Sequence, residues 1–202
     1  MRQNSQTSIP RSFFLRRTEI VARDLLGCLL VRQSNGTRLS GRIVEAEAYR
    51  GEEDLACHAK AGRTKRTEIM YGPPGFAYVY FTYGMHWMLN VVAEKEGFPA
   101  AVLIRAVEPI EGIEVMRRLR GMNEISLLCK GPGRLTQAMA IQKGENGLDF
   151  CEKASSLRIE PGVNPDDREI IASPRIGLGK TPEPWLSKSW RFCIKGNSFV
   201  SK

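Results

Sequence analysis

The alternation of hydrophobic and polar residues predicts a β-hairpin over residues 76–90. Tyr78 and Tyr80 fall on one face of its first strand, because successive side chains of a strand point to opposite faces. Thr82-Tyr83-Gly84 then interrupts the pattern, and a second apolar run follows. Since glycine readily supplies the positive φ of a tight turn, we expect Tyr83 at or next to the hairpin tip.

A bulky aromatic residue at a hairpin tip has two interpretations. In the first, the Tyr83 ring folds back onto the core of the protein. In the second, the ring is a wedge that enters between stacked bases, as the apolar side chains of minor-groove proteins do. The pattern of the hairpin alone leaves both interpretations open.

Further strands are predicted at residues 28–32, 42–49, 100–107 and 190–194. In the second of these, Glu45, Glu47 and Tyr49 share one face, which is either exposed to solvent or lines a pocket. In the third, Arg105 is the only charged residue. Its side chain must reach water or meet a carboxylate, because an unpaired buried charge is too costly.

Three helices are expected. The first covers residues 19–26 and ends at Gly27, and the last covers residues 135–141. Between them, a helix is predicted to begin at Glu108-Pro109 and to carry one apolar stripe. The stripe consists of Ile110, Ile113, Met116 and Leu119.

Loops account for most of the remaining chain. Residues 1–10 are polar and expected to be flexible, and residues 142–170 are rich in loop-forming residues. The segment 51–66 is charged, with room for one helical turn around residues 55–59. We find no internal repeat and no linker, so the 202 residues are expected to form a single domain.

Composition narrows the class of protein. With 30 Lys and Arg against 22 Asp and Glu, the net charge of +8 suits a polyanionic partner such as nucleic acid. No apolar stretch has the length of a spanning helix or a signal peptide, so we expect an intracellular protein without membrane contact. The five cysteines are odd in number and widely spaced, and the two histidines form no zinc motif.

The candidate chemistry comes from an acidic strand, an aromatic hairpin and one arginine. Aromatic rings hold a flat base by stacking, and a carboxylate such as Glu47 can act as a general base on water. Arg105 beside that carboxylate would keep it ionised. This combination suits hydrolysis of an N-glycosidic bond, for which an enzyme must first flip the nucleotide out of the helix.

At these residues the chain strongly resembles the alkyladenine (3-methyladenine) DNA glycosylase family. The resemblance covers nearly the whole chain from about residue 13 onward, with several motifs in the right order. The matching segments are GRIVEAEAYRGEEDLACHA (41–59), YVYFTYGMHWMLN (78–90), LIRAVEPIEGIEVMR (103–117), KGPGRLTQAMAI (130–141) and RIGLG (175–179).

The resemblance implies a catalytic role for three positions. Glu47, the glutamate of the EAY motif, would be the general base that activates water. Arg105 would hold that water together with Glu47, and the backbone at Ile176 would complete the site. Alternation alone could not choose between Glu47 and Glu45. Because no lysine lies in the motif segments around Glu47 or Tyr80, the nucleophile is expected to be water and the enzyme monofunctional.

The resemblance also implies how a base is held. Tyr49, His58 and Tyr80 would sandwich the flipped base, and Asn90 would guard the pocket against the amino group of normal guanine. Without the motif, a lone histidine such as His58 would be interpreted as a structural residue. The implied substrates are purines of the 3-methyladenine, hypoxanthine and ethenoadenine class in double-stranded DNA, handled by a monomer without cofactor or metal.

Tyr83 matches the intercalating residue of the family, and Met85 falls at a minor-groove contact beside it. The implied fold is α+β, a single mixed domain in which a curved antiparallel sheet is flanked by helices and carries a protruding β-hairpin. Two alternatives remain: a binding module for damaged or distorted nucleic acid without catalysis, and a metal-dependent nuclease. The nuclease would use Glu45, Glu47, Glu52 and Asp54.

Overall fold

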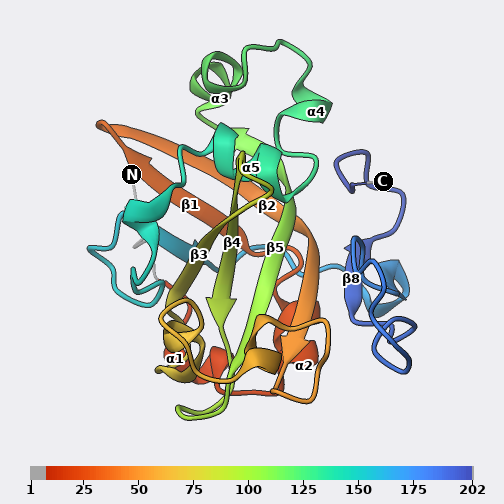
Figure 1. Cartoon of the computed structure of the whole chain (residues 1–202). Helices are drawn as coiled ribbons and strands as arrows, with labels where there is room; N and C mark the ends of the chain where they lie inside the picture. Colours follow the sequence, from red (N-terminus) through yellow and green to blue (C-terminus); the bar gives the residue numbers. More distant parts are fainter. Residues whose placement is uncertain (1–7, 202) are drawn as a thin grey trace.

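One antiparallel sheet organises the chain (Figure 1). The structure, a computed structural model, describes residues 8–201. The strands run in the order β3-β4-β5-β2-β1-β6, and β8 pairs with both β2 and β7. They comprise β1 Leu29–Ser34, β2 Thr37–Arg50, β3 Ala77–Thr82, β4 His86–Val92, β5 Ala100–Glu111, β6 Leu157–Glu160, β7 Ile170–Ser173 and β8 Arg191–Ile194.

The helices gather at the two ends of the sheet. In Figure 1, α1 and α2 lie at one end of the long strands, and α3, α4 and α5 lie at the other. Their bounds are α1 Arg11–Phe14, α2 Thr18–Asp24, α3 Ile113–Arg120, α4 Ile125–Leu128 and α5 Pro132–Ala138, with short 3-10 turns at His58–Ala61, Glu68–Tyr71, Lys143–Glu145 and Asp167–Glu169. The implied α+β fold, with its helix-flanked antiparallel sheet, is confirmed.

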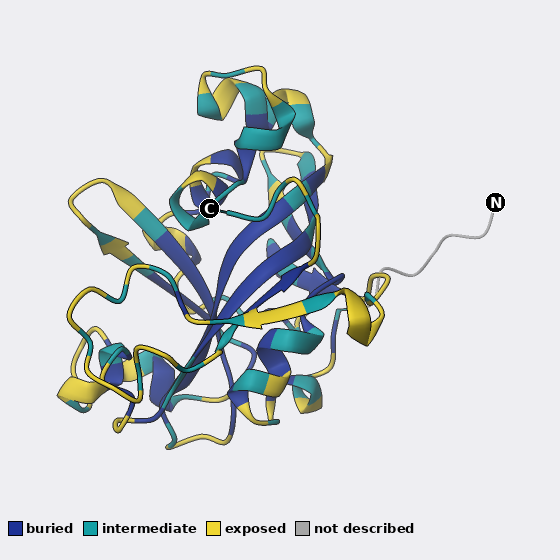
Figure 2. Cartoon of the chain, turned by 90° about the vertical axis from the view of Figure 1, so that its right-hand side faces the viewer, coloured by how far each residue is buried: buried dark blue, intermediate teal, exposed yellow. Residues whose placement is uncertain are grey.

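Two hydrophobic clusters cover the sheet. The larger one joins α2, α3 and α5 to the central strands, whose middles are buried (Figure 2). The smaller cluster lies beneath the segment 51–72 and packs Cys57, Met70 and Tyr71 against Tyr78 and Ala101 of the sheet. This smaller cluster covers only part of its sheet face. The rest of that face is left for polar residues.

The strand β2 is the element that carries the acidic residues. It pairs with β5 on one side, and on the other with β1 near its start and with β8 through Glu45–Glu47. Register shifts lie on both sides of Glu45 in the β2–β5 ladder. Such irregularities bend a strand and re-aim its side chains. The acidic stretch is therefore fixed between two neighbouring strands.

The predicted hairpin and the strands at 28–32, 42–49, 100–107 and 190–194 are confirmed, within a few residues at their ends. The prediction that a helix begins at Glu108-Pro109 is wrong. The strand β5 continues to Glu111, and the helix α3 begins at Ile113. Pro109 stands opposite Gly41, next to a register shift, where a proline without an N–H is tolerated. Consequently Ile110 is exposed and does not join an apolar stripe.

The C-terminal half is more ordered than the loop prediction for residues 142–170 allowed. That range contains β6, which pairs with β1. The last predicted helix, α5, starts three residues early, with Pro132 in its first turn. Of the segment 1–10, residues 1–7 lie outside the described residues, while Ile9 is buried and donates its N–H to the carbonyl of Ile159.

All five cysteines are free thiols, and four of them are buried. Burial raises the pKa of Cys57 and of Cys129 to about 12, and that of Cys28 and of Cys151 to about 11. The pKa of Cys193 is raised for the same reason. At neutral pH these thiols are protonated.

Candidate active site

A cavity of about 380 Å³ opens between the β3–β4 hairpin, the segment 55–60 and the loop that follows Arg175. Seven of the nine residues implied by the sequence line it; Glu47 lies directly behind its wall, and Met85 lies at the hairpin tip. The seven are Tyr49, His58, Tyr80, Tyr83, Asn90, Arg105 and Ile176.

Glu47 is fully buried and held by donors that themselves line the cavity. The backbone N–H of Ile176 donates to its Oε1 at 2.7 Å, and the hydroxyl of Tyr49 donates to its Oε2 at 2.9 Å. The Nη1 of Arg105 reaches the same Oε2 at 3.3 Å. A carboxylate accepts about four hydrogen bonds, so Glu47 keeps capacity for one more donor.

The neighbouring carboxylate, Glu45, is equally buried but is bound differently. Its Oε1 accepts from Nε of Arg105 and from Nε of Arg191, both at 2.7 Å. The N–H of Ser201 donates to its Oε2 at 2.7 Å. Glu45 thus takes two of its donors, Arg191 and Ser201, from outside the cavity lining, whereas all three donors of Glu47 line the cavity.

The two carboxyl groups differ in acidity for the same reason. Burial raises the pKa of Glu47, and its three donors only partly offset that rise. Burial also works against ionisation of Glu45, but its two arginines and Ser201 outweigh burial and lower its pKa. Paired groups with opposite shifts are typical of sites in which one carboxylate takes up a proton and the other stays charged.

Arg105 joins the two carboxylates. It extends from β5, and its side chain is only 8% exposed. Burial opposes its charge, but Glu47 and Glu45 more than compensate and raise its pKa. An arginine in an apolar strand must either reach water or meet a carboxylate, and Arg105 meets carboxylates.

Aromatic rings also line the cavity. The rings of His58 and Tyr80 are 4.5 Å apart and nearly perpendicular, and Nδ1 of His58 lies 2.9 Å from the hydroxyl of Tyr78. Burial, then the charges of Arg66 and Lys60, lower the pKa of His58 to about 4. His58 is therefore neutral at physiological pH. Tyr78 lines the cavity as well, although the sequence analysis gave it no role in the site.

The hairpin tip stands out into solvent beside the cavity. Tyr83 is 77% exposed and Met85 is 68% exposed. Both Tyr83 and Gly84 have positive φ, 51° and 67°, and the N–H of Met85 donates to the carbonyl of Thr82 at 3.2 Å. These features define a type I′ turn. The interpretation in which Tyr83 folds back onto the core is therefore wrong.

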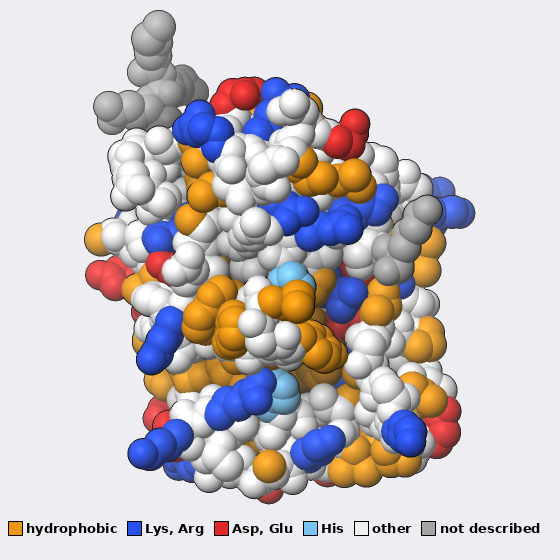
Figure 3. All heavy atoms as spheres, turned by 45° about the horizontal axis from the view of Figure 1, so that its top comes forward, with side chains coloured by type: hydrophobic (Ala, Val, Ile, Leu, Met, Phe, Trp, Pro, Cys, Tyr) orange, Lys and Arg blue, Asp and Glu red, His pale blue; other side chains and the backbone are white. Residues whose placement is uncertain are grey.

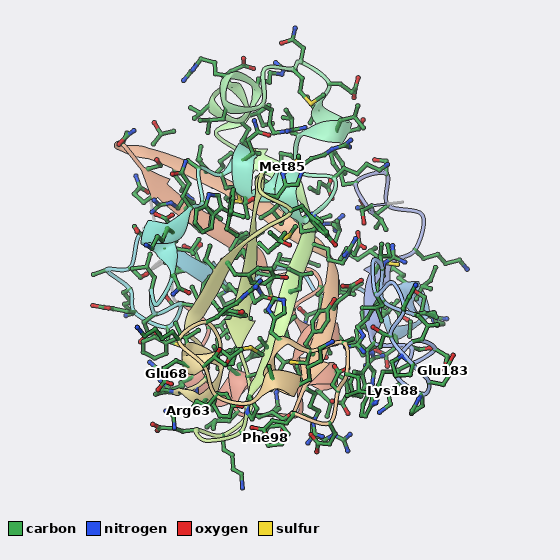
Figure 4. The ribbon with its side chains drawn as sticks, in the orientation of Figure 1. Arg63, Glu68, Met85, Phe98, Glu183 and Lys188 are labelled. Carbon is green, nitrogen blue, oxygen red and sulfur yellow. The ribbon has the colours of Figure 1, made fainter. Side chains whose placement is uncertain are left out.

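One face of the protein is apolar at its centre and basic around it (Figure 3). Figure 3 shows hydrophobic side chains gathered at the centre of one face, with Lys and Arg on either side of them. Figure 4 places Met85 at the end of the sheet next to α5, the helix that packs against β4. Such a face, apolar at the centre and basic around it, suits a nucleic-acid backbone.

Comparison with known proteins assigns the chain. A sequence model of the family described as Methylpurine-DNA glycosylase (MPG) matches residues 12–198. A protein of Methanocella arvoryzae is 50% identical over 195 residues, which are 96% of this chain and 96% of that protein. Proteins of Carboxydothermus hydrogenoformans and Clostridium acetobutylicum are 47% and 48% identical, over 96% and 95% of this chain and 98% and 96% of their own. All three are provisionally named 3-methyladenine DNA glycosylases.

The chain belongs to the methylpurine-DNA glycosylase family. It is therefore a DNA glycosylase, an enzyme of base-excision repair that acts on DNA, and the family resemblance found in its motifs is confirmed. Within residues 8–201, no helix has both the length and the apolar character needed to cross a membrane.

One pair in this glycosylase was missed by sequence reasoning. Arg175 and Asp54 are both fully buried and form two hydrogen bonds of 2.6 and 2.9 Å. The same guanidinium donates to the carbonyl of Ala48 and lies 4.7 Å from the centroid of the Tyr49 ring. Arg175 thus fixes the backbone that precedes Ile176. Because the partners are 121 residues apart, no spacing in the sequence could have connected them.

Proposed function

We propose that this glycosylase flips alkylated or deaminated purines out of duplex DNA and hydrolyses the N-glycosidic bond with a water activated by Glu47, leaving an abasic site. The substrates are of the 3-methyladenine, hypoxanthine and ethenoadenine class. The observation that supports this most is the setting of Glu47: a fully buried carboxyl with a raised pKa, bound by three residues that line an aromatic cavity.

The chemistry assigned to Glu47 is general-base catalysis. A water held between Glu47 and Arg105 gives a proton to the carboxylate, and its oxygen attacks C1′ of the sugar. The bond from C1′ to the purine breaks, and the base leaves with the electron pair. The raised pKa of Glu47 makes it a stronger base, while the charge of Arg105 keeps it ionised.

The damaged base is held by aromatic side chains. Tyr49, Tyr80 and His58 all line the cavity, and we propose that a flat ring stacks among them. Neutral His58 can accept or donate a hydrogen bond without repelling a cationic, methylated purine. Asn90 is buried at the wall, where its side chain donates to the carbonyl of Tyr78, and it would exclude the amino group of guanine.

Tyr83 would fill the space that the flipped nucleotide leaves, with Met85 beside it in the minor groove. The net charge of +8 and the basic side chains around the apolar centre of the face in Figure 3 favour contact with the phosphates of double-stranded DNA. We propose that a single copy of the chain acts alone.

The test uses a duplex oligonucleotide with one hypoxanthine, under single-turnover conditions, with and without EDTA. We expect free base and an intact sugar-phosphate strand in both samples. Glu47→Gln should still bind the duplex but excise at least about 100-fold more slowly, in the range of a lost general base. Glu53→Gln, which changes an exposed carboxylate of the same region, is the matched control.

Other products would support a different function. Binding without base release, by the unaltered protein, would favour a binding module. Strand cleavage that stops with EDTA would favour a metal-dependent nuclease. Equal excision by Glu47→Gln and the unaltered protein would refute the role of Glu47.

A further inference from the structure

The end of the described chain returns to Glu45, the carboxylate next to Glu47 on β2. Residues 195–201, the C-terminal segment, follow β8 and extend beyond its upper end in Figure 1. Within this segment, Ser201 makes two contacts with Glu45: its N–H donates to Oε2 at 2.7 Å, and its hydroxyl donates to Oε1 at 2.9 Å. A coil segment thus supplies two donors to a fully buried carboxylate.

Arg191 ties this segment to the sheet. Its Nε donates to Glu45 at 2.7 Å, and its Nη2 donates to the carbonyl of Ser201 at 3.1 Å. Its Nη1 is 3.2 Å from the hydroxyl of Ser173 on β7. Arg191 therefore holds both Glu45 and the residue that caps Glu45.

Glu45 in turn fixes the orientation of Arg105. The Nε of Arg105 is bound to Glu45, while its Nη1 reaches Glu47 at 3.3 Å and its Nη2 lies 3.2 Å from the Ser201 hydroxyl. A guanidinium is planar and rigid, so anchoring one edge determines where its other nitrogens point. The long contact to Glu47 depends on the short contact to Glu45.

We propose that Ser201 and Arg191 are positioning residues for catalysis: they hold Glu45 where it aims Arg105 at Glu47. This inference rests on the proposed role of Glu47 as general base. Neither residue touches the cavity, and neither Ser201 nor Arg191 belongs to the motif segments that carry the family resemblance.

Loss of this support has a defined effect on the charge of Glu47. The groups that face Glu47 are Arg105 from β5, Tyr49 and Glu45 from β2, the Ile176 amide, and Tyr80 from β3 at longer range. Among these, Arg105 is the cation that offsets burial and the negative charge of Glu45. If Arg105 shifts away, the proton binds Glu47 more tightly, and the acid limb of the rate–pH profile moves to higher pH.

The test compares two substitutions at one position. Ser201→Pro removes both the N–H and the hydroxyl, whereas Ser201→Ala removes only the hydroxyl. Ser198→Ala, in the same segment, is the control, because the contact made by Ser198 uses its backbone carbonyl, which binds Lys130. Single-turnover excision of hypoxanthine is measured from pH 5 to 9, with binding of the same duplex and thermal melting recorded for each variant.

We expect Ser201→Pro to slow excision at neutral pH by about 10- to 100-fold, the scale of a small misplacement of a catalytic group. Its acid limb should move to higher pH, while duplex binding changes by less than about twofold. Ser201→Ala should show a smaller change in the same direction. Ser198→Ala should match the unaltered protein.

A folded Ser201→Pro variant with the original rate and the original acid limb would overturn the inference. If that variant fails to fold, Ser201→Ala decides: a rate and pH profile identical to those of Ser198→Ala would overturn it. Failure of the proposed function is distinguishable, because Glu47→Gln would then retain excision. An inactive Glu47→Gln together with an unaffected Ser201→Pro refutes the positioning role alone.

Discussion

Replacing Tyr83 by asparagine should stabilise the protein while weakening base flipping. Tyr83 occupies the first central position of a type I′ turn with φ 51°. A left-handed conformation costs a residue other than glycine about 1–2 kcal/mol, but asparagine tolerates it, and Asn-Gly is the favoured pair for this turn. Since the Tyr83 side chain is 77% exposed, its removal sacrifices little burial.

The size of both effects follows from the structure. Relief of part of the backbone cost should raise the free energy of unfolding by about 0.5–1 kcal/mol. For a domain of this size, that corresponds to an increase in Tm of about 1–4 °C. Loss of the ring removes a stacking contribution of about 1–3 kcal/mol, so excision from duplex DNA should fall about 5- to 150-fold.

The assay measures two properties of one variant. Differential scanning calorimetry gives Tm, and a fluorescent ethenoadenine in the duplex follows flipping through the change in emission as the base leaves its neighbours. Tyr83→Phe keeps both the ring and the backbone cost, and should match the unaltered protein in both measurements. A Tyr83→Asn variant with a Tm several degrees lower and with normal base flipping would refute both the backbone strain at Tyr83 and the role of its ring as a wedge.

Three further predictions concern ionisation and mechanism. Because burial raises the pKa of Glu47, excision should fall as pH decreases through a value above the ordinary 4.5 of glutamate, and a rate–pH profile from pH 4 to 8 tests this. The pKa of His58 is about 4 in the folded protein and about 6.5 in the unfolded chain, so the unfolded chain binds a proton first as pH decreases. Urea titrations should therefore show the free energy of unfolding falling by about 2 kcal/mol between pH 6.5 and pH 4. His58→Gln should reduce this loss. Borohydride should trap no covalent adduct with DNA during turnover, even though Lys60 lines the cavity; a trapped adduct that Lys60→Ala abolishes would mean that this lysine attacks.

The aromatic hairpin was predictable because a period of two is visible in a single strand. Tyr78 and Tyr80 alternate with Val79 and Phe81 along β3, and Gly84 marks the turn. The shared face of Glu45, Glu47 and Tyr49 followed from the same period. Which carboxylate faces the cavity did not follow from it.

The alternation of hydrophobic and polar residues could not predict contacts between residues far apart in the chain. The choice of Glu47 over Glu45 came from the motif, and no pattern in the sequence shows that the backbone N–H of Ile176, 129 residues later, donates to Glu47. The donors that occupy Glu45 come from β8 and the C-terminal segment, where Arg191 and Ser201 resemble ordinary surface residues. By alternation Glu45 is an alternative to Glu47, but its contacts show it to be a partner of Arg105.

The protonated cysteines have a consequence for the conditions in which this enzyme works. Methylated purines arise when electrophilic methylating agents reach a cell, and the same agents react with proteins at nucleophilic sulfur. The thiolate is the reactive form of cysteine, and at a pKa of about 11 or 12 only a minute fraction of Cys28, Cys57, Cys129 and Cys151 is ionised. These four thiols are therefore weak nucleophiles toward the agents that methylate purines.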